Sequence, residues 1–204
     1  MSLLEHLKAQ PKKYLIFDFD ETIAKLHLPW GIFIERQLEI LKKFDPELVN
    51  MKTKEMNVMS LVNIFVEKFG EIVHEPSMEW AEEFEREYDE GYTVNPELIE
   101  FIRTASQAYT CFVWSSNCTD TINRVLRKED LAQYFQAVIS KNMVQFVKPV
   151  PDGFELIFEE VADEVGANKD ISLEDFLMIG DSSADAGAAQ AAGIDFYKVE
   201  YFKR

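Results

Sequence analysis

Six side chains in separate parts of this chain could together cleave a phosphate ester. Four are aspartates, one is a serine after an apolar run, and one is a lysine before a proline. They are Asp18, Asp20, Ser115, Lys148, Asp181 and Asp185. Carboxylates that share one crevice repel each other, and a hard divalent cation such as Mg²⁺, which prefers oxygen ligands, removes that repulsion. These residue types therefore predict a magnesium site that handles phosphate.

Each residue type has a role in phosphoryl transfer. With a cation present, one aspartate can attack phosphorus directly. A second aspartate two residues later can protonate the leaving oxygen and then deprotonate the hydrolytic water. A serine and a lysine supply a hydrogen bond and a positive charge to the non-bridging oxygens, where the transition state spreads its charge.

Five short apolar runs predict the buried strands that position these side chains. Each is rich in β-branched or aromatic residues and is bounded by polar residues or glycine. The runs cover residues 14–17, 111–114, 137–139, 176–179 and 196–199. Helical patterns at 150–165 and 184–192 separate the later runs, and the second ends at Gly193. This alternation predicts a parallel sheet covered by helices, with its ligand outside the carboxyl ends of the strands.

The interval 25–95 interrupts this alternation with three apolar stripes at helical spacing. The stripe that includes Ile34, Leu38 and Leu41 is the first of them. The borders of the interval 25–95 carry signals for a turn or for the start of a helix, at Pro29-Trp30-Gly31 and at Asn95-Pro96. We expect a helical domain at 25–95, inserted after the first strand, and a core domain formed by 1–24 and 96–204.

The composition of the chain disfavours some classes of binding partner and indicates its compartment. The 204 residues carry a net charge of −16, which disfavours binding to nucleic acid or to an anionic membrane. No segment approaches the length of a membrane span, and the expected compartment is the reducing cytoplasm. Of the two cysteines, Cys111 lies within an apolar run and is expected in the core, whereas Cys118 is expected to be an ordinary thiol at the polar rim.

In order along the chain, DFDET at 18–22, Ser115, Lys148-Pro149 and GDSSAD at 180–185 resemble the four motifs of the haloacid dehalogenase (HAD) superfamily. The resemblance covers nearly the whole chain, and GDSSADAGAAQAAGID is similar to the phosphoglycolate phosphatase and phosphoglucomutase branch. It implies an α/β fold with a Rossmann-like five-stranded parallel core and an all-helical cap of the C1 type.

The resemblance also assigns roles. It implies that Asp18 is the nucleophile and a Mg²⁺ ligand, and that Asp20 is the general acid and base and binds the metal through its carbonyl. Ser115 and Lys148 would hold phosphate, with Ser116 as the alternative to Ser115. Asp181 would complete the metal site, and Asp185 would bind or orient the metal.

Because of two features, the substrate of this protein cannot be inferred from the resemblance. Glu21 stands where many relatives of this branch have glycine, which places a further acid beside the nucleophile. Lys25, His27, Trp30 and Arg36 lie where they could touch a leaving group, but they form no specificity pattern, and we leave them out of the predicted site.

Competing functions differ in what they require. A receiver-type signalling domain has no place for the helical insert, and a dehalogenase does not need Asp20. A phosphosugar mutase and a non-catalytic binding protein of the same fold remain the alternatives. The sequence therefore predicts a Mg²⁺-dependent phosphatase that acts on a small phosphorylated metabolite through an aspartyl-phosphate. It does not indicate the leaving group or the oligomeric state.

Overall fold

A parallel sheet of five strands forms the centre of the protein, in a computed structural model that describes residues 2–51, 56–166 and 171–203. The order of the strands across the sheet is β5-β4-β1-β6-β7. Their bounds are β1 Tyr14–Phe17, β4 Thr110–Trp114, β5 Ala137–Ile139, β6 Phe176–Gly180 and β7 Asp195–Lys198. The chain runs from β1 to β4 on one side and later to β6 on the other, so the strand order reverses between β1 and β6. This arrangement confirms the predicted fold class, and the reversal is the place where open α/β sheets bind ligands.

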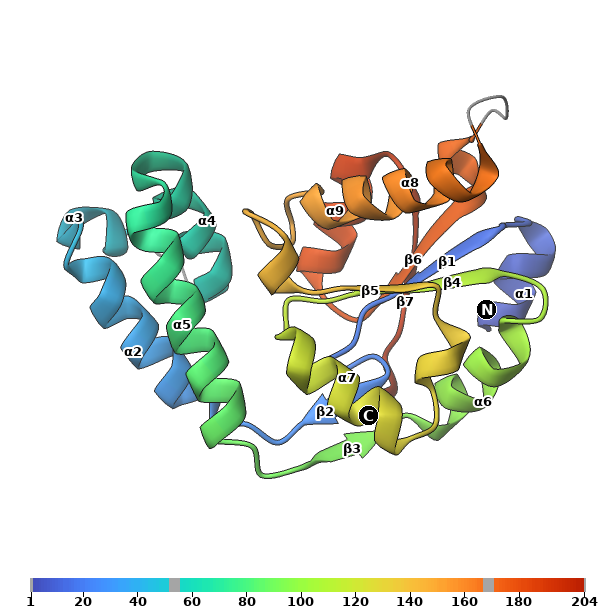
Figure 1. The fold of residues 1–204 in the computed structure, drawn as a ribbon, viewed down its shortest axis with the longest axis horizontal. Coiled ribbons are helices and arrows are strands. Elements are labelled where there is room, and N and C mark those ends of the chain that lie inside the picture. Colours follow the sequence, from blue (N-terminus) through green and yellow to red (C-terminus); the bar gives the residue numbers. More distant parts are fainter. Residues whose placement is uncertain (1, 52–55, 167–170, 204) are drawn as a thin grey trace.

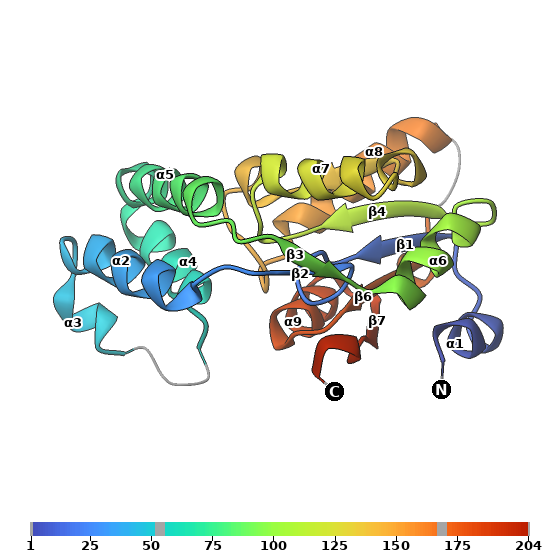
Figure 2. The same ribbon diagram turned by 90° about the horizontal axis from the view of Figure 1, so that it is seen from below.

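Helices cover both faces of the sheet (Figure 1). Alternate side chains of β1 point to opposite faces, with Leu15 and Phe17 in one apolar cluster and Ile16 in the other. Figure 2, a view turned by 90°, shows the same layers from below. The helices α1 Leu3–Ala9, α6 Pro96–Ala105 and α7 Thr119–Lys128 contribute to the first cluster, and α8 Asp152–Val165 and α9 Ser183–Ala192 to the second.

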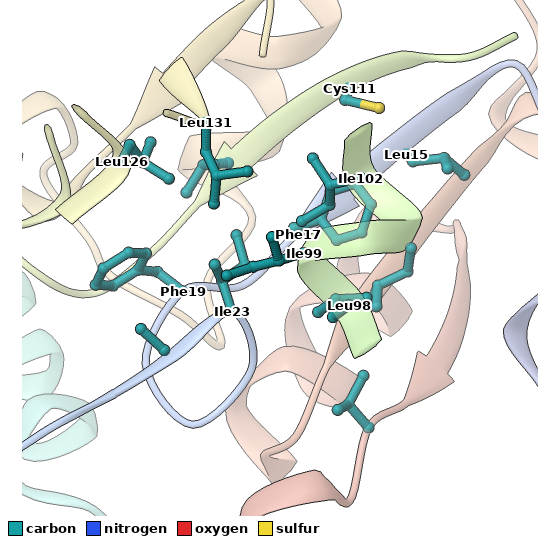
Figure 3. Packing of buried hydrophobic residues seen from close by; sticks show 14 of the residues in the cluster. Leu15, Phe17, Phe19, Ile23, Leu98, Ile99, Ile102, Cys111, Leu126 and Leu131 are labelled. Carbon is teal, nitrogen blue, oxygen red and sulfur yellow. The ribbon is translucent and has the colours of Figure 1, made fainter. Parts of the chain in front are cut away.

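The first cluster anchors the strand that carries the predicted nucleophile. Phe17 is fully buried between the sheet and α6, where it lies close to Ile102 (Figure 3). Phe19 and Ile23, from the turn after β1, are also fully buried in this cluster. Full burial of such side chains contributes about 1.5–3 kcal/mol each. The backbone on both sides of Asp18 is therefore held in place by apolar packing.

On the opposite face, α8 lies unusually close to the sheet. A Cβ at Gly153 would overlap the indole ring of Trp114, which is 2% exposed at the end of β4. Glycine at this position therefore allows the helix to pack directly over the ring. The contact positions the start of α8, just after Lys148 and Pro149.

The insert consists of helices joined to the core through two short strands. Its helices are α2 Trp30–Lys42, α3 Pro46–Val49, α4 Val58–Phe69 and α5 Glu71–Glu87. The strands β2 Ala24–Leu26 and β3 Tyr92–Val94 pair antiparallel where the chain leaves and re-enters the core. The expectation of an all-helical insert is therefore wrong at its two ends, because strands of three residues are too short to show an alternating pattern. The division into domains at 25 and 95 stays a prediction.

The insert has an apolar core of its own. Leu41, Leu61, Phe65 and Val73 bring α2, α4 and α5 together. The predicted stripe on α2 is wrong at Ile34, which is 37% exposed, because the helix turns Phe33 inward instead. Within the described part of the chain, no helix combines the length and the apolar character that crossing a bilayer requires.

Candidate active site

The predicted functional segments meet at the carboxyl ends of β1, β4 and β6, on the side of the sheet that faces the insert (Figure 1). The Asp18 N–H donates to the carbonyl oxygen of Ile179 at 2.8 Å, which extends the β1–β6 pairing up to the nucleophile position. A cavity of about 350 Å³ lies here, and side chains of the core and of the insert line it. Asp18, Asp20, Lys148, Asp181 and Asp185 are all part of its wall.

Lys148 joins two of the aspartates. Its Nζ lies 2.6 Å from Asp18 Oδ1 and 2.5 Å from Asp185 Oδ1, and it also donates to the Trp114 carbonyl oxygen at 3.0 Å. The side chains of all three charged residues are at most 9% exposed. The positive charge of Lys148 therefore lies next to the predicted nucleophile. A residue that binds the phosphate group attacked by Asp18 has to lie in this position.

Burial and crowding change the protonation of this cluster. Burial, together with the neighbouring Asp185, raises the pKa of Asp18 to about 8, although Lys148 opposes the change. Burial also disfavours the charge on Asp185, but Lys148 and Ser182 outweigh it and lower its pKa. The two carboxylates outweigh burial at Lys148 and raise its pKa, so this lysine is protonated at neutral pH. The negative charge of Asp18 is thus disfavoured in the folded protein, and a nearby cation would compensate it.

Asp185 is held in place through both of its carboxylate oxygens. Oδ1 contacts Lys148, while Oδ2 accepts hydrogen bonds from the Ser182 N–H at 3.0 Å and the Ser182 hydroxyl at 2.6 Å. Ser182 in turn caps α9 by accepting the Asp185 N–H, which completes a capping box. A Cβ at Gly180 would lie 2.6 Å from the Asp185 carboxyl group, so glycine there makes room for it. Asp185 therefore serves the helix start and orients Lys148 at the same time.

Three carboxylates converge in a manner that fits a divalent cation. One oxygen each from Asp18, Asp181 and Asp185 lies within 4.8 Å of the others, and all three residues are buried. Mg²⁺ prefers oxygen ligands and is commonly held by a few carboxylates together with water and phosphate oxygens. The donor set thus suits this ion, and these three residues would hold it. The fourth predicted ligand, Asp20, does not belong to this carboxylate group, as expected of a residue whose predicted ligand atom is its backbone carbonyl.

Asp20 lies in the turn after β1 and forms part of the cavity wall. Its Oδ1 accepts the Leu26 N–H at 2.8 Å, which ties the turn to β2. Burial raises the pKa of Asp20 to about 7, although the Leu26 N–H opposes the change. A carboxyl group that titrates near neutral pH suits a residue that must donate a proton and later accept one.

The adjacent Glu21 has a left-handed backbone, with φ of 57°. Glycine adopts this conformation without strain, which explains in physical terms why glycine suits the position. The Glu21 side chain turns to Lys25 and pairs with it at 2.7 Å. Both of these side chains are more than a third exposed, so the pair adds little stability.

The two serines after β4 differ in their access to the cavity. The Ser115 hydroxyl is buried, donates to Asn117 Oδ1 at 3.0 Å and accepts the Asn117 N–H at 3.1 Å. Ser116 and Asn117, rather than Ser115, line the cavity. Phosphate contact by Ser115 stays a prediction, and Ser116 has the better access.

The insert contributes several cavity residues that sequence reasoning missed or left out. Trp30 and Phe33 from α2 form an aromatic wall, and Asn57 and Met59 lie at the start of α4. Trp30, which the sequence places near a leaving group without a specificity pattern, does line the cavity. The missed residues carry no chemical motif, and only the folding of the insert over the sheet brings them to the site.

The cysteines take no part in this site. Cys111 is buried in the core as expected, but the placement of Cys118 at a polar rim is wrong. Cys118 is 4% exposed at the N-terminus of α7, under the insert. Burial raises the pKa of each thiol to about 12, which makes both poor nucleophiles.

A five-stranded α/β core with an aspartate after β1, a second two residues later, and an acid-bearing loop after β6 defines a class of hydrolases. The family model for haloacid dehalogenase-like hydrolases matches residues 15–199. The chain therefore belongs to this family, and the resemblance found in the sequence is confirmed.

Individual relatives agree with this assignment. The HAD-hydrolase YfnB of Bacillus subtilis (strain 168) is 25% identical over 115 residues, a match that spans 56% of this chain but only 46% of that protein. Its magnesium-bound crystal structure superposes with a TM-score of 0.55 at 21% identity, over 93% of this chain and 87% of that one.

Two further solved structures share the fold. One is described as a phosphoglycolate phosphatase from Lactobacillus plantarum, with a TM-score of 0.58, 20% identity, and coverage of 91% and 84% of the two chains. The other is described as a β-phosphoglucomutase from Thermotoga maritima, with a TM-score of 0.53, 19% identity, and coverage of 91% and 84%. At these identities the likeness concerns the fold alone.

Proposed function

We propose that the protein is a Mg²⁺-dependent phosphatase that hydrolyses a small phosphomonoester through an aspartyl-phosphate at Asp18. One observation carries the proposal: Asp18 lies 2.6 Å from Lys148 and shares a 4.8 Å cluster with Asp181 and Asp185. Lys148 lies on one side of this carboxylate, and the acids on the other side could hold Mg²⁺. A phosphoryl group on Asp18 would then have its oxygens neutralised by the lysine and by the bound cation.

In the first step, a carboxylate oxygen of Asp18 attacks phosphorus while the bond from phosphorus to the leaving oxygen breaks. Asp20 donates its proton to that oxygen, and the alcohol leaves. The pKa of about 7 means that a substantial fraction of Asp20 carries this proton at neutral pH. Lys148 stays against the non-bridging oxygens, where the transferring group carries its charge.

In the second step, the Asp20 carboxylate takes a proton from a water molecule, which then attacks phosphorus. The bond between phosphorus and the Asp18 oxygen breaks, inorganic phosphate forms, and Asp18 returns as a carboxylate. Asp20 regains its proton for the next cycle. Bound Mg²⁺ would neutralise the carboxylates and draw charge from the phosphoryl oxygens.

The cavity is suited to a small substrate. Its volume is about 350 Å³, and Trp30, Phe33 and Met59 of the insert contribute apolar residues to its wall. Such a cavity suits a compact leaving group that packs one face against an aromatic ring. The net charge of −16 disfavours a nucleic-acid substrate through long-range repulsion.

Phosphate release from an aryl phosphate tests this function. The wild type is assayed with Mg²⁺ and with a chelator, beside Asp18→Asn and the control Asp163→Asn, whose side chain is exposed on α8. We expect metal-dependent release by the wild type and the control, and none by Asp18→Asn. Near-normal release by Asp18→Asn would rule out the nucleophile assignment.

A phosphosugar mutase is the second candidate, because it would use the same residues and a solved mutase shares the fold. In a mutase, the phosphoryl group on Asp18 passes to a second sugar hydroxyl instead of water. Incubation with sugar phosphates separates the two functions: a phosphatase accumulates inorganic phosphate, while a mutase forms an isomeric sugar phosphate without net release.

A further inference from the structure

The docking of α5 on the core places one buried carboxylate of the insert next to the active site. Two acids one turn apart on this helix reach the core. Glu82 accepts a hydrogen bond from the Asn142 side chain at an exposed position. Glu85, in contrast, is 3% exposed and lies beneath the helix.

Glu85 contacts three groups of the core at once. Its Oε1 lies 2.6 Å from Lys141 Nζ, and its Oε2 accepts the Cys118 N–H at 2.9 Å. The Asn117 side-chain amide approaches Oε1 at 3.5 Å. All of these partners belong to the two loops that follow β4 and β5, so a single side chain of the insert joins both loops.

These loops border the proposed phosphatase site. Asn117 and Lys141 line the same cavity as Asp18. The Lys141 ammonium lies over the aromatic ring of Phe33 from the insert, with Nζ 5.8 Å from the ring centroid. Asn117 in turn forms two hydrogen bonds with the Ser115 hydroxyl. A continuous chain of contacts thus runs from Glu85 on the insert to the strand-end serine at the predicted phosphate position.

The buried charges of Lys141 and Glu85 compensate each other only when the insert lies against the core. The side chains of Lys141 and Glu85 are 3% and 2% exposed, and each gives up water to reach the other. Burial disfavours the charge on Lys141, but Glu85 outweighs it and raises the pKa of the lysine. When α5 moves away, Lys141 loses this partner and the Cys118 N–H loses its acceptor.

From these contacts we infer that Glu85 is a positioning residue of the proposed phosphatase. By pairing with Lys141 and binding the Cys118 N–H, it holds the Ser115–Asn117 loop in its active arrangement when the insert is docked. The inference rests on the proposed function for its catalytic consequence, but its structural half, the ordering of the loop by Glu85, stands without it.

The test compares Glu85→Gln with Glu83→Gln, a matched change at an exposed position on the same helix. Glutamine keeps the shape and an acceptor but leaves Lys141 without its countercharge. We expect Glu85→Gln to lower kcat for an aryl phosphate by about tenfold or more, because small displacements of positioning groups are costly. Amide exchange across residues 115–119 should become about tenfold faster. Glu83→Gln should match the wild type in both measurements.

A double variant separates the pair from a direct role of Lys141. Glu85→Gln combined with Lys141→Met removes both charges, and we expect it to regain folding stability and part of kcat relative to Glu85→Gln alone. Equal behaviour of Glu85→Gln and Glu83→Gln would overturn the inference, and so would a double variant no better than the single one. If the wild type hydrolyses no phosphomonoester, the proposed function fails, and the exchange comparison still decides whether Glu85 orders the loop.

Discussion

Replacing Asp18, the proposed nucleophile, should stabilise the metal-free protein, because burial among other acids disfavours its negative charge. Asp18 is buried beside Asp185 and Asp181, and one lysine is shared between two of these acids. Asp18→Asn keeps the size of the side chain and can still accept a hydrogen bond from Lys148. The variant removes one negative charge and leaves Lys148 its partner Asp185.

The size of the effect follows from the pKa of Asp18, which rises from 3.8 to about 8 in the folded protein. Between these values the folded protein keeps a proton that the unfolded chain releases, so stability falls as the pH rises. The loss amounts to roughly 3 kcal/mol between about pH 5 and about pH 7. Asp18→Asn lacks this contribution and should lose correspondingly less stability over the same range.

Urea unfolding in the presence of a chelator measures the difference. We expect Asp18→Asn to be more stable than the wild type at neutral pH, and Mg²⁺ to stabilise the wild type more than the variant. The exposed-site control Asp163→Asn should stay within about 0.5 kcal/mol of the wild type. The reasoning is refuted if Asp18→Asn is the less stable protein in chelator, or if its stability falls as steeply with pH as that of the wild type.

Three further substitutions test other parts of the account. Asp20→Asn should lower kcat by about 10²–10⁴-fold for substrates with poor leaving groups and remove the fall in rate above about pH 7, as a pH–rate profile will show. An unchanged profile would contradict the acid role. Lys148→Met leaves buried acids unpaired and should cost about 3 kcal/mol or more in urea unfolding, whereas a stable variant would refute the charge argument. Gly153→Ala should lower Tm despite the better helix propensity of alanine, at a cost of about 1–3 kcal/mol, because its Cβ meets the Trp114 ring. A raised Tm would show that α8 can shift.

The centre of the core could be predicted from the sequence because the strands β1, β4 and β6 are buried on both faces and therefore appear in the sequence as short apolar runs. The strand containing Ile16 was predicted with both ends correct, and the run at 176–179 is only one residue shorter than β6. The aspartates after these strands could be placed together because parallel strands end on the same side of a sheet. The joint engagement of Asp185 with Ser182 and Lys148 could not be predicted, since it depends on how α9 starts.

The part contributed by the insert was harder to predict. Glu85 belongs to a helix rich in exposed acids, and nothing in the sequence distinguishes it from Glu83. Its burial depends on how α5 docks against the loops after β4 and β5, and that docking is long-range. The same reason applies to Cys118, which was expected at the rim and is covered by the insert. The strands β2 and β3 were not predicted, because a segment of three residues is too short to show the alternating pattern of a strand.

Trapping of the phosphorylated enzyme tests the central claim most directly. The wild type is mixed with an aryl phosphate and Mg²⁺, quenched in acid and treated with borohydride, which reduces an acyl phosphate to an alcohol. The account predicts that Asp18 is converted to homoserine, found by mass spectrometry of the peptide that contains β1, and that no conversion occurs without substrate or in Asp18→Asn. Phosphate release with no modification at Asp18, or with the modification at another aspartate, would contradict the account.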